Sequence, residues 1–259
     1  MYYHWHLMLL ICHMLFRDKA MISLDSVDST NNYAANLIKL SLPPEGTVIT
    51  AQVQTAGKGQ RLSFWESAEG ENILCSFILY PRFLPASDQF ALSQIIALAI
   101  RETAEDLTQQ PCHVKWPNDI ICNDKKLSGI LIETSWTGSK ISYSIVGIGL
   151  NINQSSFVCS KAISVKQITG KFCDRDEALI HLIENVEKYY LRLKSGNLRE
   201  ISQEYHKHLY RIGIPAQFIF EEKEITATII GVDHLGRLKL MTSANEHITC
   251  DLKEISMVF

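Results

Sequence analysis

The sequence predicts an α+β protein, with a mixed or antiparallel sheet in a larger domain and a small β-barrel after it. Apolar residues recur at helical spacing from Gln89 to Leu107, and strand-like segments with short connections fill the region from His113 to Asn153. Beyond Arg211 only short alternating segments occur, as in a small barrel of roughly fifty residues. We therefore expect an N-terminal extension over residues 1–20, a larger domain over 21–210 and a β-domain over 211–259.

The first sixteen residues, MYYHWHLMLLICHMLF, are apolar and aromatic and precede Met21 closely. They have no charged region before the apolar part and no clear small-residue cleavage site, and they are fewer than the roughly 20 apolar residues that a spanning helix needs. We expect neither a signal peptide nor a membrane span. Our hypothesis is that translation begins at Met21; an intact mass that includes residues 1–20 would contradict it.

The first half of the larger domain contains one helix and two strands. The segment DSTNNYAANLIKL predicts a short amphipathic helix capped by Ser29 or Thr30 and ended by Pro43 and Pro44. TVITAQVQ and NILCSFILY are apolar runs typical of buried strands. Between them, TAGKGQRLSFWESAEGE has glycines, charges and no period, so we expect a mobile loop over residues 55–68.

After the helix over 89–107, the order of elements changes from hairpins to helices and then to short strands. HVKW, DIIC, LSGILIETSW and ISYSIVGIGLNIN predict strands in hairpin succession, which favours a mixed or antiparallel sheet over strict alternation of strand and helix. Helices are expected over 174–193 and 198–209. AQFIF, EITATIIGV, RLKLM and HITCDL are the short strands of the predicted barrel.

Composition limits the possible partners and compartment. With 259 residues, 46% of them hydrophobic, the chain can bury a substantial core. A formal net charge of -3 gives no basic surface of the kind that nonspecific nucleic-acid binding needs. Seven cysteines without a CxxC pair indicate reduced thiols in a cytoplasmic protein, and no close cysteine or histidine pair has zinc-finger spacing, so we expect no resident metal site.

Four segments carry residue types suited to chemistry. The loop Gln54–Arg61 joins glycines, which let backbone N–H groups approach an anion, with two cations, although it lacks the spacing of a P-loop and a solvated turn remains an alternative. Lys115–Asp119, KWPND, places a cation, an aromatic face and two polar side chains beside a proline, or is a plain strand end and turn. Lys126–Ile130 and Gly147–Asn153 have glycines inside strands, which often mark close approach of a ligand.

Together, five segments closely resemble the bacterial biotin protein ligase family in order and spacing. They are STN at 29–31, QTAGKGQR at 54–61, KWPND at 115–119, KLSGILIE at 126–133 and GIGLNIN at 147–153, and the similarity covers roughly residues 22–259. The resemblance implies a catalytic domain related to class II aminoacyl-tRNA synthetases and lipoate ligases, followed by an SH3-like barrel. About twenty residues precede the motifs, too few for the DNA-binding domain of some members, so we expect the monofunctional type.

The resemblance implies that the protein activates biotin with ATP and Mg²⁺ and transfers it to a lysine of a biotin carboxyl carrier domain. Biotin binding is then expected at Ser29, Thr30, Asn31, Gln54, Gly57, Lys58, Gly59, Gln60, Lys126 and Gly129. ATP binding is expected at Arg61, Trp65, Lys115, Asn118 and Asn151. Catalysis is expected at Lys58, Arg61, Asp119 and Lys126, where the cations offset the repulsion between carboxylate and phosphate.

The chain departs from the family pattern in the glycine-rich loop. The family usually has arginine where this chain has Lys58 and Gln60, and glycine where it has Leu62. Lysine keeps the charge but loses bidentate geometry, and glutamine loses the charge too, so retention of the adenylate is expected to depend more on Arg61 and Lys126.

Asp119 has two interpretations: it orients or deprotonates the acceptor amine, or it only fixes the KWPND turn. Four rival functions remain to be weighed. They are a lipoate or octanoate ligase, a cysteine-based acyl transferase, a biotin-sensing repressor and a noncatalytic binding module. The pairing of KWPND with GIGLNIN disfavours the lipoate or octanoate ligase, and the absence of cysteine from the central motifs, other than Cys122, disfavours the acyl transferase. The short N-terminal segment disfavours the repressor, and Lys126 disfavours the noncatalytic module. Monomer and homodimer are both open, and the GLNIN segment is a candidate edge strand for sheet extension.

Overall fold

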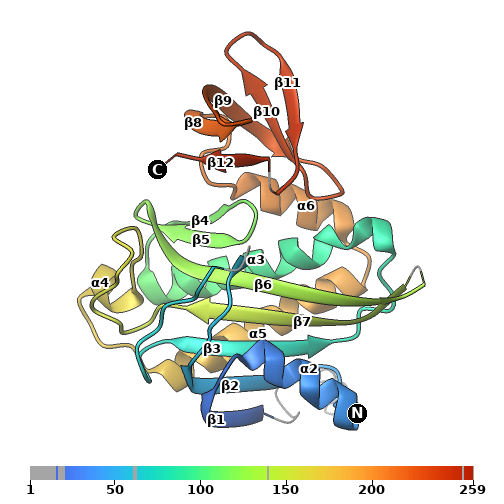
Figure 1. Cartoon of the computed structure of the whole chain (residues 1–259), viewed down its shortest axis with the longest axis vertical. Coiled ribbons are helices and arrows are strands. Elements are labelled where there is room, and N and C mark those ends of the chain that lie inside the picture. Colours follow the sequence, from blue (N-terminus) through green and yellow to red (C-terminus); the bar gives the residue numbers. More distant parts are fainter. Residues whose placement is uncertain (1–15, 17–20, 61–62, 139, 253, 259) are drawn as a thin grey trace, which may run out of the picture.

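The computed structural model describes residue 16 and residues 21–60, 63–138, 140–252 and 254–258, and the structural statements below concern these residues. A seven-stranded mixed sheet forms the main body, in the order β1-β2-β3-β7-β6-β5-β4 (Figure 1). The strands are β1 (Met21–Val27), β2 (Thr47–Gln54), β3 (Ile73–Leu79), β4 (Cys112–Lys115), β5 (Asp119–Cys122), β6 (Lys125–Thr137) and β7 (Lys140–Leu150). β1 pairs with β2 in parallel, and the other neighbouring strands pair antiparallel.

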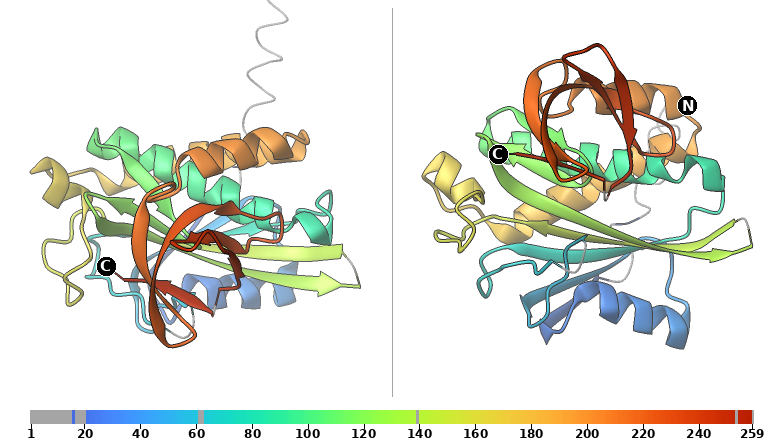
Figure 2. Two further views of the ribbon diagram at one scale, coloured as in Figure 1. Left: turned by 90° about the horizontal axis from the view of Figure 1, so that it is seen from above. Right: turned by 45° about the horizontal axis from the view of Figure 1, so that its top comes forward.

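Helices cover both faces of this sheet (Figures 1 and 2). α2 (Thr30–Ser41) packs on one face over β2, β3 and β7, with Ala34, Ile49, Ile78 and Ile145 in its small apolar cluster. α3 (Phe90–Thr108) and α5 (Arg175–Lys194) pack on the other face, and α6 (Leu198–Lys207) packs against α3. The short elements η2 (Ala86–Asp88) and α4 (Val165–Thr169) lie in connections. The larger apolar core therefore lies between the sheet and α3, α5 and α6.

The side chains of β7 alternate between the two faces of the sheet, and the residues on the α2 face include two glycines. Val146, Ile148 and Leu150 belong to the large core on the α3 side. Since successive side chains of a strand point to opposite faces, Gly147 and Gly149 face α2, where Ile145 also packs. The sequence thus removes side-chain bulk from one face of the strand while the other face keeps aliphatic packing.

The C-terminal part forms a five-stranded antiparallel sheet that curls beside α6 and β4 (Figure 2). Its order is β11-β10-β9-β8-β12, from β8 (Pro215–Phe220), β9 (Lys223–Val232), β10 (Leu238–Thr242), β11 (His247–Cys250) and β12 (Ile255–Met257). The Trp116 indole N–H donates to Gly236 O at 2.8 Å, which joins the KWPND turn to this sheet. The domain boundary at residue 211 stays a prediction.

The expected helices and most expected strands are confirmed, and one expectation about an edge strand is wrong. The GLNIN segment is not at an edge: β7 lies between β3 and β6, because β3 pairs with β7 across a long sequence separation. Pattern analysis also omitted β1, α4 and β12. Apart from Phe16, the predicted N-terminal extension lies outside the described residues. Among the described helices, none has the length and apolar character to cross a bilayer.

Phe16 is buried in the core on the α5 side of the sheet. Its ring centroid lies 5.8 Å from that of Tyr190 and 6.4 Å from that of Phe77. A side chain at Gly46, where φ is +84°, would collide with this ring, so the glycine serves both the turn and the contact.

Candidate active site

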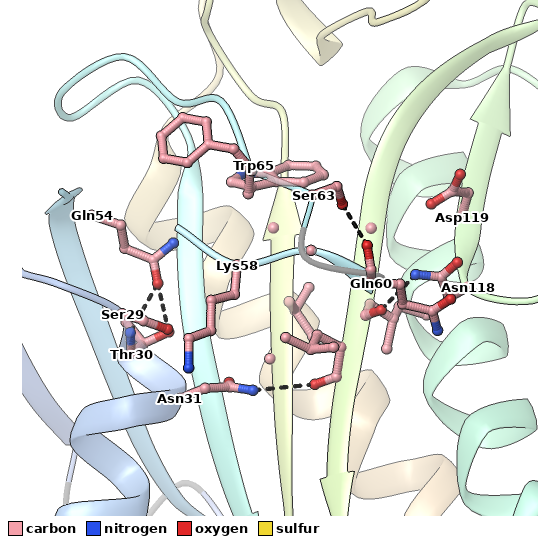
Figure 3. A pocket seen from close by; sticks show the side chains of 18 of the residues that line it. Ser29, Thr30, Asn31, Gln54, Lys58, Gln60, Ser63, Trp65, Asn118 and Asp119 are labelled. Atoms are coloured by element: carbon pink, nitrogen blue, oxygen red, sulfur yellow. Dashed lines mark hydrogen bonds between the residues drawn. The ribbon is translucent and has the colours of Figure 1, made fainter. Parts of the chain in front are cut away.

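A network of polar side chains forms one end of a cavity of about 210 Å³ between α2 and the sheet, the first cavity. Ser29 stands at the N-cap of α2 as expected, but its side chain makes no capping hydrogen bond. Gln54, the last residue of β2, accepts hydrogen bonds at Oε1 from Thr30 N (2.9 Å) and Thr30 Oγ1 (3.1 Å) (Figure 3). Asn31 Nδ2 donates to Glu133 Oε2 at 2.7 Å. These fixed partners orient the groups that a polar ligand would meet.

Ser76 completes this network from the middle of β3. Its Oγ lies 2.7 Å from Thr30 Oγ1 and 2.6 Å from Asn31 Oδ1, so its single proton bonds one of the two at a time. Neither Ser76, outside the motifs, nor Glu133, the last residue of KLSGILIE, was predicted as a site residue. The available signal was a hydroxyl within ILCSFIL, a strand whose seven residues are all buried, because a buried hydroxyl needs a partner.

The indole of Trp65 lies against β6 and β7 where two glycines leave room (Figure 3). A Cβ at Gly149 would lie 2.3 Å from Trp65 Cε2, and a Cβ at Gly129 would lie 2.8 Å from Trp65 Cζ3. Any larger residue at these positions would displace the ring or the strand. The glycines were predicted to mark close approach of a ligand. In this structure they are in contact with a side chain of the protein, that of Trp65.

Trp65 also borders a second cavity of about 340 Å³, on the side of β5 and the segment after β7. Trp65, Asp119 and Lys126 line both cavities. Among the described residues, three that line this second cavity carry a buried polar atom without a hydrogen-bond partner: Trp65 Nε1, a donor, and Asn151 Oδ1 and Asp119 Oδ1, acceptors, of which Asp119 Oδ1 is ion-paired with Lys126. Leaving a buried polar group without a partner is unfavourable, so Trp65 and Asn151 are candidates for contact with a ligand.

Charged side chains meet where the two cavities join. Lys126 Nζ lies 2.7 Å from Asp119 Oδ1 and 5.4 Å from the centroid of the Trp65 ring. Lys115 Nζ lies 4.0 Å from Asp119 Oδ2. Burial is the main cause that lowers the pKa of Lys115, with further lowering by the charges of Lys126 and Lys161, while Asp119 opposes the shift. Positive charge is thus crowded around one carboxylate, and a bound anion would relieve the crowding.

The KWPND turn places Asp119 at this junction. Asn118 Nδ2 donates to Ile130 O at 2.8 Å, and Ile130 N donates to Asn118 O at 2.9 Å, so both groups of Asn118 fix the turn to β6. The Trp116–Pro117 peptide bond is cis. This rigid turn gives Asp119 a defined position opposite Lys126.

The structure brings most of the expected site residues together. Ser29, Thr30, Asn31, Gln54, Lys58, Gly59, Gln60, Trp65, Asn118, Asp119, Lys126 and Gly129 line the first cavity. Lys115 and Asn151 line the second. Gly57 lines neither: its carbonyl accepts a hydrogen bond from Trp65 N at 3.0 Å, so it holds the loop. Arg61 and Leu62 lie outside the described residues.

Lys58 is held by the N-terminal end of α2. Its Nζ donates to Asn32 Oδ1 at 2.5 Å, and Asn32 in turn donates to Asp28. The pKa of Asp28 is lowered, mainly by that hydrogen bond from Asn32 and, to a smaller degree, by the charge of Lys58. The loop cation therefore lies at the first cavity, on the α2 side.

Comparison with known proteins places the chain among related sequences. The model of the biotin/lipoate A/B protein ligase family matches residues 23–151. The bifunctional ligase/repressor BirA of Bacillus spizizenii is 31% identical over 223 residues, which cover 84% of this chain and 68% of that protein. The biotin acetyl-CoA-carboxylase ligase of Paracoccus denitrificans is 29% identical over 233 residues, which cover 85% and 94%.

Solved structures extend the likeness to the whole fold. The biotin protein ligase from Aquifex aeolicus, in complex with biotin and ATP, matches with a TM-score of 0.77 and 28% identity, covering 93% of this chain and 99% of that chain. This chain therefore belongs to the biotin/lipoate A/B protein ligase family. Within the family it is a biotin protein ligase.

Proposed function

We propose that the first cavity binds biotin, that the second binds ATP, and that the chain joins them as biotinyl-5′-AMP before transfer to a carrier lysine. The observation that carries this proposal is the junction of the two cavities at Lys126, Asp119 and Trp65. An acyl adenylate forms only if a carboxylate and the α-phosphate of ATP meet, and a cation between the two cavities offsets the repulsion of these anions.

In the first step a carboxylate oxygen of biotin attacks the α-phosphorus, and pyrophosphate leaves. Lys126 stands between the cavities with Nζ in reach of both, and we assign it to the developing charge. Lys58 adds a cation near the α2 end of the first cavity. The cyclic urea of biotin would meet the polar network of Ser29, Thr30 and Gln54, which combines donors and acceptors with buried walls.

The base of ATP fits the unpartnered atoms of the second cavity. Asn151 Oδ1 is an acceptor, suited to the exocyclic amine of adenine, and guanine presents an oxygen acceptor at the same place. Trp65 Nε1 can donate to a ring nitrogen. Biotin-dependent turnover should therefore require ATP rather than GTP.

We also propose that the 55–68 loop orders over the adenylate, which hydrolyses readily in water. Trp65 belongs to this loop and touches β6 and β7, so closure would seal the junction between the cavities. Limited proteolysis provides the test: cleavage within the loop that biotin plus ATP does not suppress would contradict closure.

In the second step the carrier lysine attacks the adenylate carbonyl, and AMP leaves. Asp119 already binds one ammonium group, that of Lys126. When Lys126 turns to the phosphate and carboxylate, the same carboxylate can receive the ammonium of the acceptor lysine and accept its proton.

Magnesium would enter with ATP rather than occupy a protein cage. The carboxylates that line the second cavity are Asp119 and Glu66; the first is paired with Lys126, and the second accepts a hydrogen bond from Val158 N at 2.9 Å. Such a site suits an ion held mainly by phosphates, which neutralises their charge. The carrier domain of a biotin-dependent carboxylase is the expected acceptor, and a cytoplasmic location follows as a prediction from cysteines that are free wherever described.

The deciding experiment measures pyrophosphate release from ATP and magnesium with biotin, lipoate or octanoate. Release with biotin alone supports the proposal, because the polar network suits a cyclic urea and the other two acids lack one. Release with lipoate or octanoate instead would move the chain to the neighbouring branch of its family, and the absence of release with all three would contradict an adenylating function.

A further inference from the structure

Two of the buried cysteines lie opposite each other in the β4–β5 hairpin (Figure 1). Cys112 is the first residue of β4 and Cys122 the last of β5, and the two are register partners in this antiparallel pair. Both side chains are fully buried in the large core, so they lie on the same face of the sheet. The chemistry proposed above uses neither thiol.

The hydrogen bonds around the hairpin show which kind of pair the two cysteines form. Cys112 N donates to Glu105 Oε1 at 3.1 Å rather than to β5. Two residues along, Val114 N donates to His208 O at 2.8 Å, again not to β5. Because opposite residues of an antiparallel ladder alternate between hydrogen-bonded and non-hydrogen-bonded pairs, Cys112 and Cys122 form a non-hydrogen-bonded pair. The Cα atoms of such a pair are about 4.5 Å apart, with the side chains at their closest.

This spacing suits a disulfide. A disulfide joins Cα atoms about 4.4–6.8 Å apart and Cβ atoms about 3.5–4.5 Å apart, whereas facing Cβ atoms of a strand pair are about 4.5–5.5 Å apart. Closing the bond therefore needs an approach of about 1 Å and no change of register. The other two buried cysteines among the described residues, Cys75 and Cys250, have no cysteine as a register partner.

Polar neighbours favour reaction at Cys122. A hydrogen bond from the Cys112 thiol is the main cause that lowers the pKa of Cys122; burial opposes this, and the Thr108 hydroxyl adds to it. The thiolate is the form that attacks a peroxide. Cys112 keeps its proton, because donating this hydrogen bond and being buried raise its pKa, so it is in place as the second thiol.

The hairpin between the two cysteines carries the KWPND turn. Asp119 stands in β5 with Cys122, and Lys125, the register partner of Cys122 in β6, directly precedes Lys126. Pulling the end of β5 toward β4 by about 1 Å would shift Asp119 relative to Lys126. These two groups are 2.7 Å apart at the junction of the cavities. A displacement of this size can cost about 10²-fold in rate.

We propose that Cys112 and Cys122 are a redox-sensitive pair, at which hydrogen peroxide closes a disulfide across the hairpin and slows adenylation. The Cys122 thiolate attacks one peroxide oxygen, the O–O bond breaks, and hydroxide leaves and takes a proton, so that Cys122 becomes a sulfenic acid. The Cys112 sulfur then attacks the Cys122 sulfur, and the sulfenic hydroxyl leaves as water with the proton of Cys112. Two thiols and one peroxide thus give one disulfide and two waters. The effect on adenylation rests on the proposed function, whereas formation of the disulfide does not.

Mass spectrometry detects the disulfide without any need for turnover. Trypsin cleaves after Lys115, so Cys112 and Cys122 fall on different peptides. After treatment with hydrogen peroxide and alkylation of the remaining thiols, we expect these two peptides to be joined, and dithiothreitol to separate them. Cys75 should be recovered alkylated, because no described cysteine faces it.

The parent protein for the test lacks three other cysteines. Cys159→Ser and Cys173→Ser remove an exposed and a half-buried thiol that peroxide would also oxidise, and Cys12→Ser removes the cysteine outside the described residues. In this parent, Cys112→Ala removes the pair. Cys75→Ala is the matched control, since it removes another buried thiol but leaves the pair intact.

Biotin-dependent pyrophosphate release by the parent should fall about tenfold on oxidation and return with dithiothreitol. Cys112→Ala should be insensitive to peroxide, and Cys75→Ala should respond like the parent; Cys122→Ala repeats the test from the other strand if Cys112→Ala does not fold. The inference is overturned if no joined peptides form, if joined peptides leave the rate unchanged, or if peroxide inhibits Cys112→Ala equally. If the reduced parent releases no pyrophosphate with any of the three acids, the proposed function fails, and joined peptides would still support the modification site.

Discussion

Gly149→Ala tests whether the seat of Trp65 on the sheet is a real packing constraint. The added Cβ would lie 2.3 Å from Trp65 Cε2, 2.6 Å from Cζ2 and 2.7 Å from Nε1. Ordinary contact between carbon atoms is about 3.5 Å, so the ring would have to move by about 1 Å. Overpacking of this kind costs about 1–3 kcal/mol, and we expect the free energy of unfolding to fall by that amount.

The assay is urea unfolding of a double-mutant cycle with Trp65→Ala. Without the indole, the methyl group at position 149 has room, so Gly149→Ala should then cost nearly nothing and the coupling energy should be about 1–3 kcal/mol. Gly147→Ala is the matched control: it lies two residues earlier in β7, but its Cβ would collide with Asn31 Oδ1 at 2.4 Å. Trp65→Ala should not rescue it.

Equal destabilisation by Gly149→Ala with and without the indole would show that the ring does not cause the cost. The same conclusion follows if Trp65→Ala rescues Gly147→Ala as well, since the cost would then arise from the strand and not from the ring. Gly149→Ala could also lower the affinity for biotin, and Trp65→Ala need not restore it, because the methyl group also projects toward the first cavity. Such a result would be compatible with the packing result.

Three further changes test the site and one ion pair. Asp119→Asn removes the charge that binds ammonium groups. We expect single-turnover transfer from preformed adenylate to the carrier to slow about 10²-fold or more. An unchanged rate would mean that Asp119 only fixes the KWPND turn. Gln60→Arg places a cation on the wall of the first cavity and should slow dissociation of labelled adenylate several-fold, as gel filtration would show. For Asp233, burial raises the pKa, but the hydrogen bonds and charge of Arg237 outweigh this and lower it. Asp233→Asn should therefore destabilise the protein fully at neutral pH, and the difference in stability between wild type and variant should shrink as pH falls below about 4. A difference in urea midpoints that does not change with pH would refute this.

Local pattern predicted the elements whose determinants lie within a few residues. The helix at α3 shows its period in sequence, and the β4–β7 succession shows its turns, so both were predicted. β1 was missed because its pairing with β2 is parallel and crosses over through α2, and four of its seven residues are exposed. For the same reason the neighbours of β7 were not predicted: its pairing with β3 joins residues about seventy positions apart.

The motifs predicted those site residues that stand close together in the sequence. Ser76 and Glu133 position Asn31, yet Ser76 is a single polar residue outside the motifs, and Glu133, the last residue of KLSGILIE, has its partner far away in the sequence. Gly57 shows the opposite case: a motif residue expected at the ligand instead bonds the backbone of Trp65.

Trp65 borders both cavities, and under the proposed function it would also couple the binding of the two substrates. Among the described residues its buried N–H has no hydrogen-bond partner, and such a group costs about 1–3 kcal/mol. Under the proposed function, a nucleotide that supplies an acceptor to this N–H would remove the cost and favour the ring position that borders both cavities. By reciprocity, biotin that orders the loop favours the nucleotide, and about 1.4 kcal/mol of such coupling is a tenfold change in affinity. A loop of this kind ties the retention of one substrate to the presence of the other, which is what an enzyme needs to keep a hydrolysable adenylate.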